Sequence, residues 1–404
     1  MRIRPPFVAP ALSFVVAGLV VVTVAHSTIV GAATPAISTT STSTTTSTTL
    51  TTATAATSTL ACATNLVSTW SLTRVVRETI VVSAQGSSLA SLTQAARQGY
   101  GGFLLFGTSA PAALPATLRS LARLEPARTA PMVMTDDEGG GIIRFPALVG
   151  TWPWAQIMGA TMTPAQITRQ AQRVGAAMAH AGLNVDLAPV ADVDGRAQYP
   201  GGANPDGLRS FGGSPARVGV DVVAFARGLT SAHVLAVVKH FPGLGGATGN
   251  TDVAPAATLP WSTLRHGGLA PFRAAIAAGV TAVMMSNATV PGLSTLPAGL
   301  SPAVVSYLRH DLGFGGLIMT DALSAVAVSA RHLSVAQASV AALVAGVNQV
   351  LNGNPASPAL ALQTASLTTA SVVAAVSDGR LTRARLVDDA AHVLVATNPH
   401  PCGG

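Results

Sequence analysis

The sequence predicts a single-domain α/β protein of the (β/α)8 TIM barrel class. A chain of 404 residues that is 49% hydrophobic can bury a large core. Short apolar runs alternate with longer segments of helical pattern, and no low-complexity segment interrupts residues 62–404. Repeated strand and helix is typical of such a barrel, with a doubly wound open sheet as the alternative. The eight runs predicted as strands are Ile80 to Ser83, Gly102 to Phe106, Met132 to Thr135, Val185 to Pro189, Leu235 to Val238, Ala282 to Met285, Leu317 to Thr320 and Gln349 to Leu351.

The segments between the runs carry helix start and stop signals. Thr163 is a good N-cap, Pro164 suits the first helical position, and Gly182 is a typical stop. Ser214 and Pro215 likewise predict the start of a helix that runs to about residue 229.

The N-terminus has the pattern of an export signal. Arg2 and Arg4 precede an apolar run from Ala11 to Ala25, which is shorter than the ~20 residues that span a bilayer. Residues 1–33 are therefore predicted to be a signal peptide, or an N-terminal anchor that associates with the membrane if it is not cleaved. Residues 34–61, which are rich in Thr and Ser, are predicted to be a flexible linker to a domain over 62–404. We expect that domain to be secreted or held in the cell envelope.

The charge distribution and the cysteine content indicate which partners and which cellular compartment to expect. The excess of 23 Lys and Arg over 16 Asp and Glu is scattered singly, which argues against a nucleic-acid partner. The chain has two cysteines, Cys62 and Cys402, and export would bring them into an oxidising compartment. We expect them to form a disulfide that joins the two ends of the domain, and we expect a monomer.

Polar residues gather just after the predicted strands, where the active site of a barrel lies. Asp136-Asp137-Glu138 and three glycines follow the third run, and the acids could serve a ligand or form a solvated turn. The residues that follow later runs are Asp192 and Asp194, Lys239 and His240, and Asp321. Lys239 and His240 favour a site over a structural pair. Asp321 suits a nucleophile or the N-cap of the next helix equally well.

Six segments carry a resemblance to a known family. They are Asp136 to Arg144, Asn184 to Asp194 (NVDLAPVADVD), Arg209-Ser210-Phe211-Gly212, Lys239 to Gly243 (KHFPG), Leu308 to Asp321 (LRHDLGFGGLIMTD) and Ser377 to Leu386 (SDGRLTRARL). Their order and spacing resemble the signatures of the N-terminal domain of family 3 glycoside hydrolases. With no sandwich domain after them, the chain is similar to the single-domain bacterial β-N-acetylhexosaminidases that act on cell-wall fragments.

The resemblance implies roles for individual residues. Asp321 matches the catalytic nucleophile of a retaining mechanism. Five residues match positions that hold the sugar: Asp136, Arg144, Arg209, Lys239 and His240. The resemblance implies no metal and no organic cofactor, and its expected partner is a carbohydrate substrate such as a peptidoglycan-derived or other β-glycan.

The sequence departs from the family in the loop that follows KHFPG. Leu244 stands where the family has a His, and Asn250-Thr251-Asp252 stands where it has an Asp-Ser-His triplet whose His is the acid/base. Smaller departures are Asp137 for Gln, Gly141 for Arg and Ala322 for Asp. By count from Lys239, Asp252 takes the place of the acid/base, and a carboxylic acid with a raised pKa can transfer the same proton. The alternative for Asp252 is a turn cap.

The resemblance therefore implies an exported enzyme that hydrolyses β-linked amino sugars of cell-wall glycans with retention of configuration. The altered acid/base loop keeps a second hypothesis open, a catalytically weakened protein that binds cell-wall sugars. Turnover of aryl β-glycosides would distinguish the two.

Overall fold

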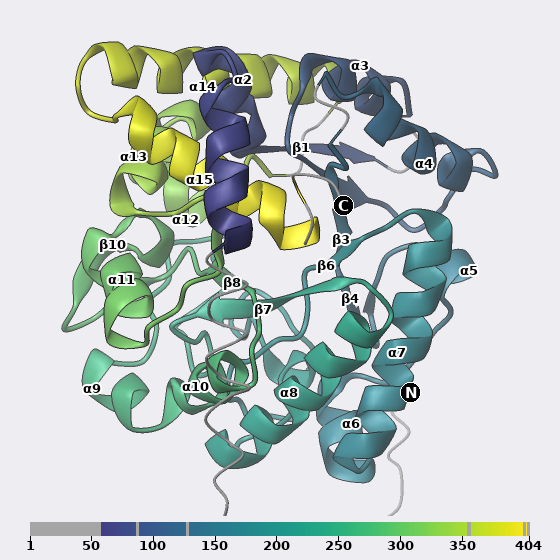
Figure 1. Ribbon diagram of the computed structural model, residues 1–404. Coiled ribbons are helices and arrows are strands. Elements are labelled where there is room, and N and C mark those ends of the chain that lie inside the picture. The colour runs from purple at the N-terminus through teal and green to yellow at the C-terminus, as the bar shows by residue number, and fades with distance from the viewer. Residues whose placement is uncertain (1–57, 86–88, 127–128, 354–356, 399–400, 402–404) are drawn as a thin grey trace, which may run out of the picture. The chain divides into compact units, whose positions relative to one another are not determined.

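Eight parallel strands form the wall of the barrel, in the order β11-β8-β7-β6-β3-β2-β1-β12 (Figure 1). The computed structural model describes residues 58–85, 89–126, 129–353, 357–398 and 401. The barrel strands are β1 (Ile80–Gln85), β2 (Gly102–Phe106), β3 (Met132–Thr135), β6 (Val185–Asp186), β7 (Leu235–Phe241), β8 (Ala282–Met285), β11 (Leu317–Thr320) and β12 (Val350–Leu351). A parallel bridge between Met319 and Gln349 brings the edge strands β11 and β12 together. The barrel prediction is confirmed, and the open-sheet alternative is wrong.

All eight predicted runs contain a strand, and four of them differ from it in length: β1 extends two residues further than predicted, β12 begins one residue later, and β6 and β7 differ more. The strand β6 ends at Asp186, three residues before the predicted end, where Pro189 has no N–H to donate to a ladder. Pairing resumes in the bridge between Val190 and Lys239. In contrast, β7 continues to Phe241, so that Lys239 and His240 belong to the strand itself.

Helices surround the sheet, as Figure 1 shows. Those with α labels are α2 (Leu72–Glu78), α3 (Leu89–Gln98), α4 (Leu114–Leu124), α5 (Pro146–Val149), α6 (Ala155–Thr161), α7 (Pro164–Ala181), α8 (Pro215–Ser231), α9 (Trp261–Thr263), α10 (Ala270–Ala277), α11 (Pro302–Ser306), α12 (Val326–Ser329), α13 (Val335–Ala345), α14 (Pro358–Ser377) and α15 (Arg383–Thr397). A helix over residues 58–68 precedes them. Because α2 packs against α14 and α15, the beginning and the end of the barrel lie side by side.

The predicted helix signals act as expected in α7. The Thr163 side chain accepts a hydrogen bond from the Gln166 N–H, the Gln166 side chain accepts one in return from the Thr163 N–H, and Gly182 ends the helix in the left-handed region at φ 91°. The second predicted helix, α8, begins at Pro215 and ends at Ser231, two residues beyond the prediction. Its N-cap residue, Ser214, makes no side-chain capping bond.

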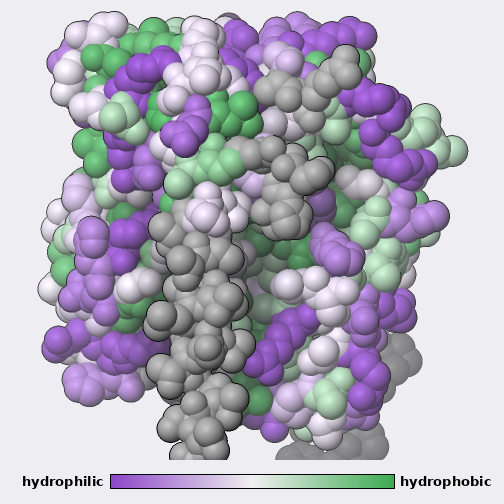
Figure 2. Space-filling view, viewed as in Figure 1, coloured by the Kyte–Doolittle hydropathy of each residue, from purple (hydrophilic) through white to green (hydrophobic). Residues whose placement is uncertain are grey.

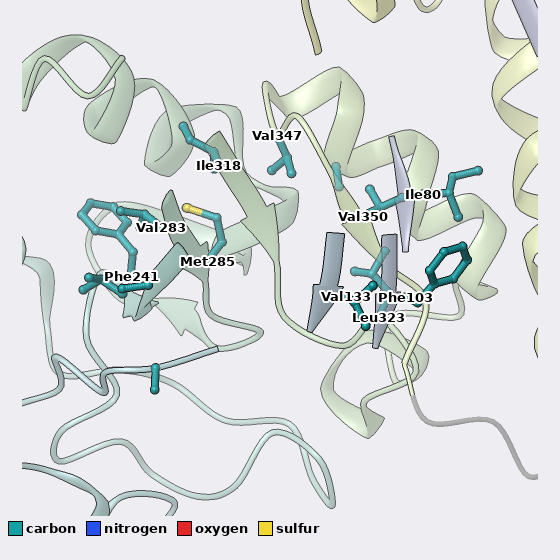
Figure 3. Close-up of a cluster of buried hydrophobic side chains, with 14 of the residues drawn as sticks. Ile80, Phe103, Val133, Phe241, Val283, Met285, Ile318, Leu323, Val347 and Val350 are labelled. Carbon is teal, nitrogen blue, oxygen red and sulfur yellow. The ribbon is translucent and has the colours of Figure 1, made fainter. Parts of the chain in front are cut away.

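The core has two layers, because successive side chains of a strand point to opposite faces. Ile80 and Val82 of β1 belong to the cluster between sheet and helices, part of which Figure 3 shows with Phe103, Val133 and Ile318. Val81, between them, belongs to a second cluster that fills the barrel interior. The interior cluster includes Leu104, Met134, Val185, Val237, Met284, Met319 and Leu351. The barrel is therefore packed below its active end and is not a channel.

Two short hairpins follow barrel strands and were not predicted. They are β4 (Asp137–Gly139) with β5 (Ile142–Ile143), after β3, and β9 (Thr289–Val290) with β10 (Ser294–Pro297), after β8. Strands this short show no hydrophobic periodicity. The first hairpin places the acidic motif at the mouth of the barrel.

The face in Figure 2 shows hydrophilic and hydrophobic side chains interspersed. Among the described residues, α14 is the helix whose length and mean hydropathy would allow a membrane span. It packs against α13 and β1, as an outer barrel helix does.

Most of the predicted N-terminal segments and one of the two cysteines lie outside the described residues. The predicted signal, residues 1–33, and residues 34–57 of the predicted linker lie outside the described residues. Cys62 lies in the helix over 58–68 and is not a free thiol. Its predicted partner, Cys402, lies outside the described residues. The pairing therefore stays a prediction.

A close approach between α7 and α8 depends on Gly228. A Cβ at this position would lie 2.6 Å from Ala171 Cβ and would overlap the carbonyl oxygen of Thr168. Helix propensity alone favours Ala by about 1 kcal/mol, but overpacking costs about 1 to 3 kcal/mol. We expect Gly228→Ala to lower the free energy of unfolding in a urea titration, whereas Thr230→Ala, at an exposed position of the same helix, should leave it unchanged or raise it slightly. A stabilised Gly228→Ala protein would contradict this packing.

Candidate active site

A cavity of about 630 Å³ opens at the carboxyl end of the barrel strands. Seven residues singled out from the sequence line it: Asp136, Arg144, Arg209, Lys239, His240, Asp252 and Asp321. They come from four places in the chain, the segments after β3, β6 and β11 and the end of β7 with its following loop. The wall also carries the apolar side chains of Leu104, Leu187, Met284 and Leu351. Polar groups above an apolar floor are typical of a small-molecule site.

Four charged residues form a cluster at one side of the cavity: Asp136, Glu138, Arg209 and Lys239. The Lys239 Nζ lies 2.7 Å from Asp136 Oδ1 and 2.6 Å from Glu138 Oε1. Arg209 donates from Nε to Glu138 Oε2 at 2.7 Å and from Nη2 to Oε1 at 2.8 Å, a bidentate pair. Glu138 and Lys239 are at most 4% exposed. Two anions and two cations thus balance one another in this charge cluster.

The charge cluster fixes its own protonation states. Burial alone would raise the pKa of Glu138, but the Arg209 and Lys239 cations hold it well below its usual range. Burial also works against the Lys239 charge, but Asp136 and Glu138 raise the pKa of Lys239 above its usual range. Glu138, Lys239 and Arg209 therefore stay charged at neutral pH, as permanent donors and acceptors for hydroxyl groups.

Arg144 stands at the edge of this cluster. Its guanidinium lies 3.9 Å from Asp136 Oδ2 and above the Phe106 ring, 5.7 Å from its centroid. Arg144 is half-buried and keeps donors available to the cavity.

His240 is oriented by a buried carboxylate. Its Nδ1 lies 2.7 Å from Asp192 Oδ2, and Asp192 Oδ1 accepts hydrogen bonds from the backbone N–H groups of His240 and Leu244. Burial and the nearby Arg209 charge lower the pKa of His240 to about 4. A neutral His240 that donates from Nδ1 to Asp192 presents Nε2 as an acceptor beside Arg209 Nη2, at 3.4 Å. His240 is therefore suited to binding a hydroxyl and not to donating a proton at neutral pH.

A second acid, Asp206, completes this group. Burial and the charge of Asp192 raise the pKa of Asp206 well above its usual value, so that Asp206 keeps its proton. Asp192, Asp206 and His240 place ligand atoms within 4.8 Å of one another, close enough for a metal ion. However, Asp192 already accepts three hydrogen bonds, and the Arg209 guanidinium adjoins His240. These contacts favour a hydrogen-bonded network over a cation site.

Asp321 projects from the end of β11 into the cavity. Its backbone N–H donates to the Met285 carbonyl oxygen at 3.0 Å, and its Oδ1 accepts from the Ala322 N–H at 2.7 Å. The next helix, α12, has Ala325 as its N-cap, so the alternative role of Asp321 as a helix cap is wrong. Burial and the Asp252 charge raise the pKa of Asp321, while His240 acts in the opposite direction.

Asp252 lies across the cavity mouth in the loop after β7. Its side chain is exposed, and its charge is close enough to affect Asp321. The loop is tied on one side to Gly202, whose carbonyl oxygen accepts from the Asn250 N–H at 2.9 Å. On the other side, the Thr251 carbonyl oxygen accepts from the Ala327 N–H at 3.0 Å. Backbone bonds thus hold this loop at the cavity wall, where the Asp252 charge acts on Asp321.

Comparisons with known proteins agree with this geometry. The model of the glycosyl hydrolase family 3 N-terminal domain matches residues 94–396. The chain belongs to glycosyl hydrolase family 3. A beta-hexosaminidase of Stenotrophomonas maltophilia is 35% identical over 272 residues, which cover 65% of this chain and 79% of that protein.

The beta-hexosaminidase LpqI of Mycobacterium tuberculosis is similar in sequence and in structure. It is 36% identical over 230 residues, which are 54% of this chain and 57% of LpqI, so the matched segment spans little more than half of that relative. The LpqI structure superposes with a TM-score of 0.74 at 28% identity, covering 84% of this chain and 97% of that one.

Sequence reasoning missed three residues of this family 3 site as functional positions: Glu138, Asp192 and Asp206. Glu138 was read as part of an acidic cluster, although strand alternation after Asp136 could have placed it on the same side. Asp192 follows a predicted strand, and that position is the signal that points to it. Asp206 lies deep in the loop after β6, where local sequence offers no signal. Conversely, Asp194 does not line the cavity, because it pairs with Arg196 at 2.8 Å.

Asp137 points away from the cavity and meets another acid, Asp186. The Asp137 N–H donates to Asp186 Oδ1 at 3.0 Å, and both residues are fully buried, so the acidic motif is not a solvated cluster. Burial raises the pKa of Asp137 to about 8, although the Arg144 N–H donates to it at 2.7 Å. Burial and Asp137 also raise the pKa of Asp186. This pair is therefore protonated in the folded protein at neutral pH.

The raised pKa of Asp137 predicts a pH-dependent stability. An unfolded Asp titrates near pH 4, so the stability that the neutral acid contributes is present below about pH 4 and is lost as pH rises through about 8. We expect Asp137→Asn to be more stable relative to the wild type at pH 8 than at pH 5, by at most ~1.4 kcal/mol per pH unit. Urea unfolding at both pH values measures this. The exposed Asp378→Asn is the control, and a pH-independent difference for Asp137→Asn would contradict the assignment.

Proposed function

We propose that the protein is a retaining glycoside hydrolase that cleaves β-linked amino sugars, with Asp321 as the nucleophile. The observation that carries this proposal is the pairing of two carboxylates without cation partners, Asp321 and Asp252, in a cavity whose other charged groups are mutually neutralised. The beta-hexosaminidase names of two family 3 relatives support the sugar class.

The roles follow from the ion pairs. Four carboxylates of the described residues line the cavity: Asp136, Glu138, Asp252 and Asp321. Asp136 and Glu138 both form ion pairs with Lys239, and the pKa of Glu138 is held below its usual range, so these two carboxylates are committed to the charge cluster. In the described part of the chain, Asp252 and Asp321 form no ion pair. These two carboxylates are therefore free for the chemistry, Asp321 to attack the sugar and Asp252 to transfer the proton.

In the first step, the Asp321 carboxylate attacks the anomeric carbon as the bond to the leaving oxygen breaks, and Asp252 gives its proton to that oxygen. In the second step, Asp252 removes a proton from water, which attacks the same carbon and releases Asp321. Two inversions give net retention. The raised pKa of Asp321 sets the acid limit of activity, because the nucleophile must be ionised.

The charge cluster would hold the sugar in the first subsite. Lys239 and Arg144 supply donors, Asp136 supplies an acceptor, and the neutral His240 Nε2 supplies a second acceptor. Because these groups are fixed by one another before any ligand arrives, binding orients the sugar at little cost in side-chain freedom.

We further propose that the enzyme works outside the cytoplasm on cell-wall glycans, with residues 1–33 as its export signal or anchor. The charged and apolar pattern of that segment supports this, and a Cys62 to Cys402 disulfide fits an oxidising compartment. The altered acid/base loop favours a second candidate, a sugar-binding protein with little turnover, and the next two experiments separate it from an enzyme.

Loss of the Asp321 carboxylate should abolish catalysis with every leaving group. We expect Asp321→Asn to reduce kcat for p-nitrophenyl N-acetyl-β-glucosaminide by about 10⁴-fold or more, with the affinity for N-acetylglucosamine retained in calorimetry. Asp378→Asn, which makes the same change at an exposed carboxylate outside the cavity lining, is the matched control. A wild type that binds the sugar without turnover would instead support the sugar-binding candidate.

Asp252→Ala should discriminate between leaving groups. A poor leaving group needs protonation, so we expect hydrolysis of a β-linked disaccharide to fall by about 100-fold or more, while glycosylation by a nitrophenyl substrate is largely spared. Azide, which needs no general base, should restore the second step and yield a β-glycosyl azide. Equal losses on both substrates, or no loss on either, would remove Asp252 from the mechanism.

A further inference from the structure

Three segments meet around Asp252 at the cavity mouth. The loop after β7 contacts residues 195–206 through the bond from the Asn250 N–H to the Gly202 carbonyl oxygen. It contacts the start of α12 through the bond from the Val326 N–H to the Asp252 carbonyl oxygen, at 3.4 Å. Backbone bonds thus connect both neighbouring segments to the loop that carries the proposed proton donor.

Each of these three segments exposes a large apolar side chain. Tyr199 is 76% exposed, Val253 is 61% exposed and Val326 is 39% exposed. Each has a cavity-lining residue next to it in the chain, namely Pro200, Asp252 and Ala325. Single exposed apolar side chains are common, but these three stand on segments that are bonded to one another at the cavity wall, where exposed apolar groups indicate ligand binding.

Tyr199 is held by an aromatic neighbour. Its ring packs edge to face on Trp154, with the centroids 6.0 Å apart and the planes at 74°. Trp154 in turn covers Gly140, whose φ of +58° and lack of a Cβ permit the contact. Tyr199 is therefore anchored to the hairpin that carries Glu138 and Ile142, while most of its ring stays open to solvent.

From this placement we propose that Tyr199, with Val253 and Val326, forms the subsite for the leaving-group sugar. The proposal rests on the proposed function, because the role of Asp252 defines the side on which the leaving group lies. A pyranose has a C–H face that an aromatic ring can cover, removing apolar surface from water and adding dispersion contacts. The substrate class is then a β-linked saccharide of at least two rings, and not a glycoside of a small alcohol.

The subsite should affect substrates according to their leaving groups. A glycosyl fluoride offers no leaving-group surface, whereas a β-linked disaccharide offers a whole ring. We expect Tyr199→Ala to lower kcat/KM for the disaccharide about 10-fold, chiefly through KM, and to change kcat/KM for the fluoride by less than about twofold. Tyr199→Phe keeps the ring and should retain disaccharide activity. The control is Leu367→Ala, on α14, where a large apolar side chain is 56% exposed and has no cavity-lining residue next to it in the chain.

A binding titration separates this proposal from the proposed function. On the Asp321→Asn background, calorimetry with N-acetylglucosamine and its β-1,4 dimer measures what the second ring contributes. We expect the dimer to bind about 10-fold more tightly than the monomer, and Tyr199→Ala to remove that difference without weakening the monomer.

Three results would overturn the subsite. They are a dimer that binds no better than the monomer, a Tyr199→Ala protein that weakens both ligands equally, and equal kinetic losses on the fluoride and the disaccharide. If the wild type hydrolyses neither substrate but the dimer retains its Tyr199-dependent advantage, the proposed catalysis fails while the subsite stands.

Discussion

The bond between the Glu138 carboxylate and the two cations, Lys239 and Arg209, is the interaction on which the site depends. It connects the hairpin after β3, the end of β7 and the loop after β6 at a point where Glu138 and Lys239 are buried and the Arg209 side chain is 16% exposed. Breaking one member of such a buried group typically costs about 3 to 5 kcal/mol, because its partner is left uncompensated. The same ion pairs keep the donors and acceptors of the cavity in one arrangement. The interaction that makes this part of the structure rigid therefore also positions the groups that would contact a ligand.

The fold was predictable because its signal is repeated. Eight apolar runs, each followed by a helical pattern, leave few topologies, and the caps at Thr163 and Gly182 mark helix ends through backbone chemistry alone. What the sequence could not show was shorter or less regular. The pair β4 and β5 contains too few residues for a period, and β6 ends early because Pro189 cannot donate.

The candidate site was predictable where residues follow strands directly, as Lys239, His240 and Asp321 do. Its supporting acids were harder to find. Asp136 and Glu138 face the cavity while Asp137, between them, is buried against Asp186, so one acidic motif contains two different environments. Asp206 reaches Asp192 from within a long loop, and only the folded backbone reveals that approach. Sequence therefore located the catalytic end, whereas the packing of charges determined which acids are ionised.

The proposed sugar-holding and leaving-group halves of the cavity are built differently. The sugar-holding half lies on strand ends and is fixed by buried ion pairs, so a change there disturbs several charges at once. The leaving-group half lies on loops that are held by backbone bonds, such as Asn250 N–H to Gly202 and Ala327 N–H to Thr251. Such bonds are made by N–H and C=O groups of the main chain, so they form whatever side chain the residue carries. The side chain at residue 252 can therefore change while the loop keeps its path, so the proposed acid/base can be a carboxylic acid with Asp321 and the charge cluster still in position.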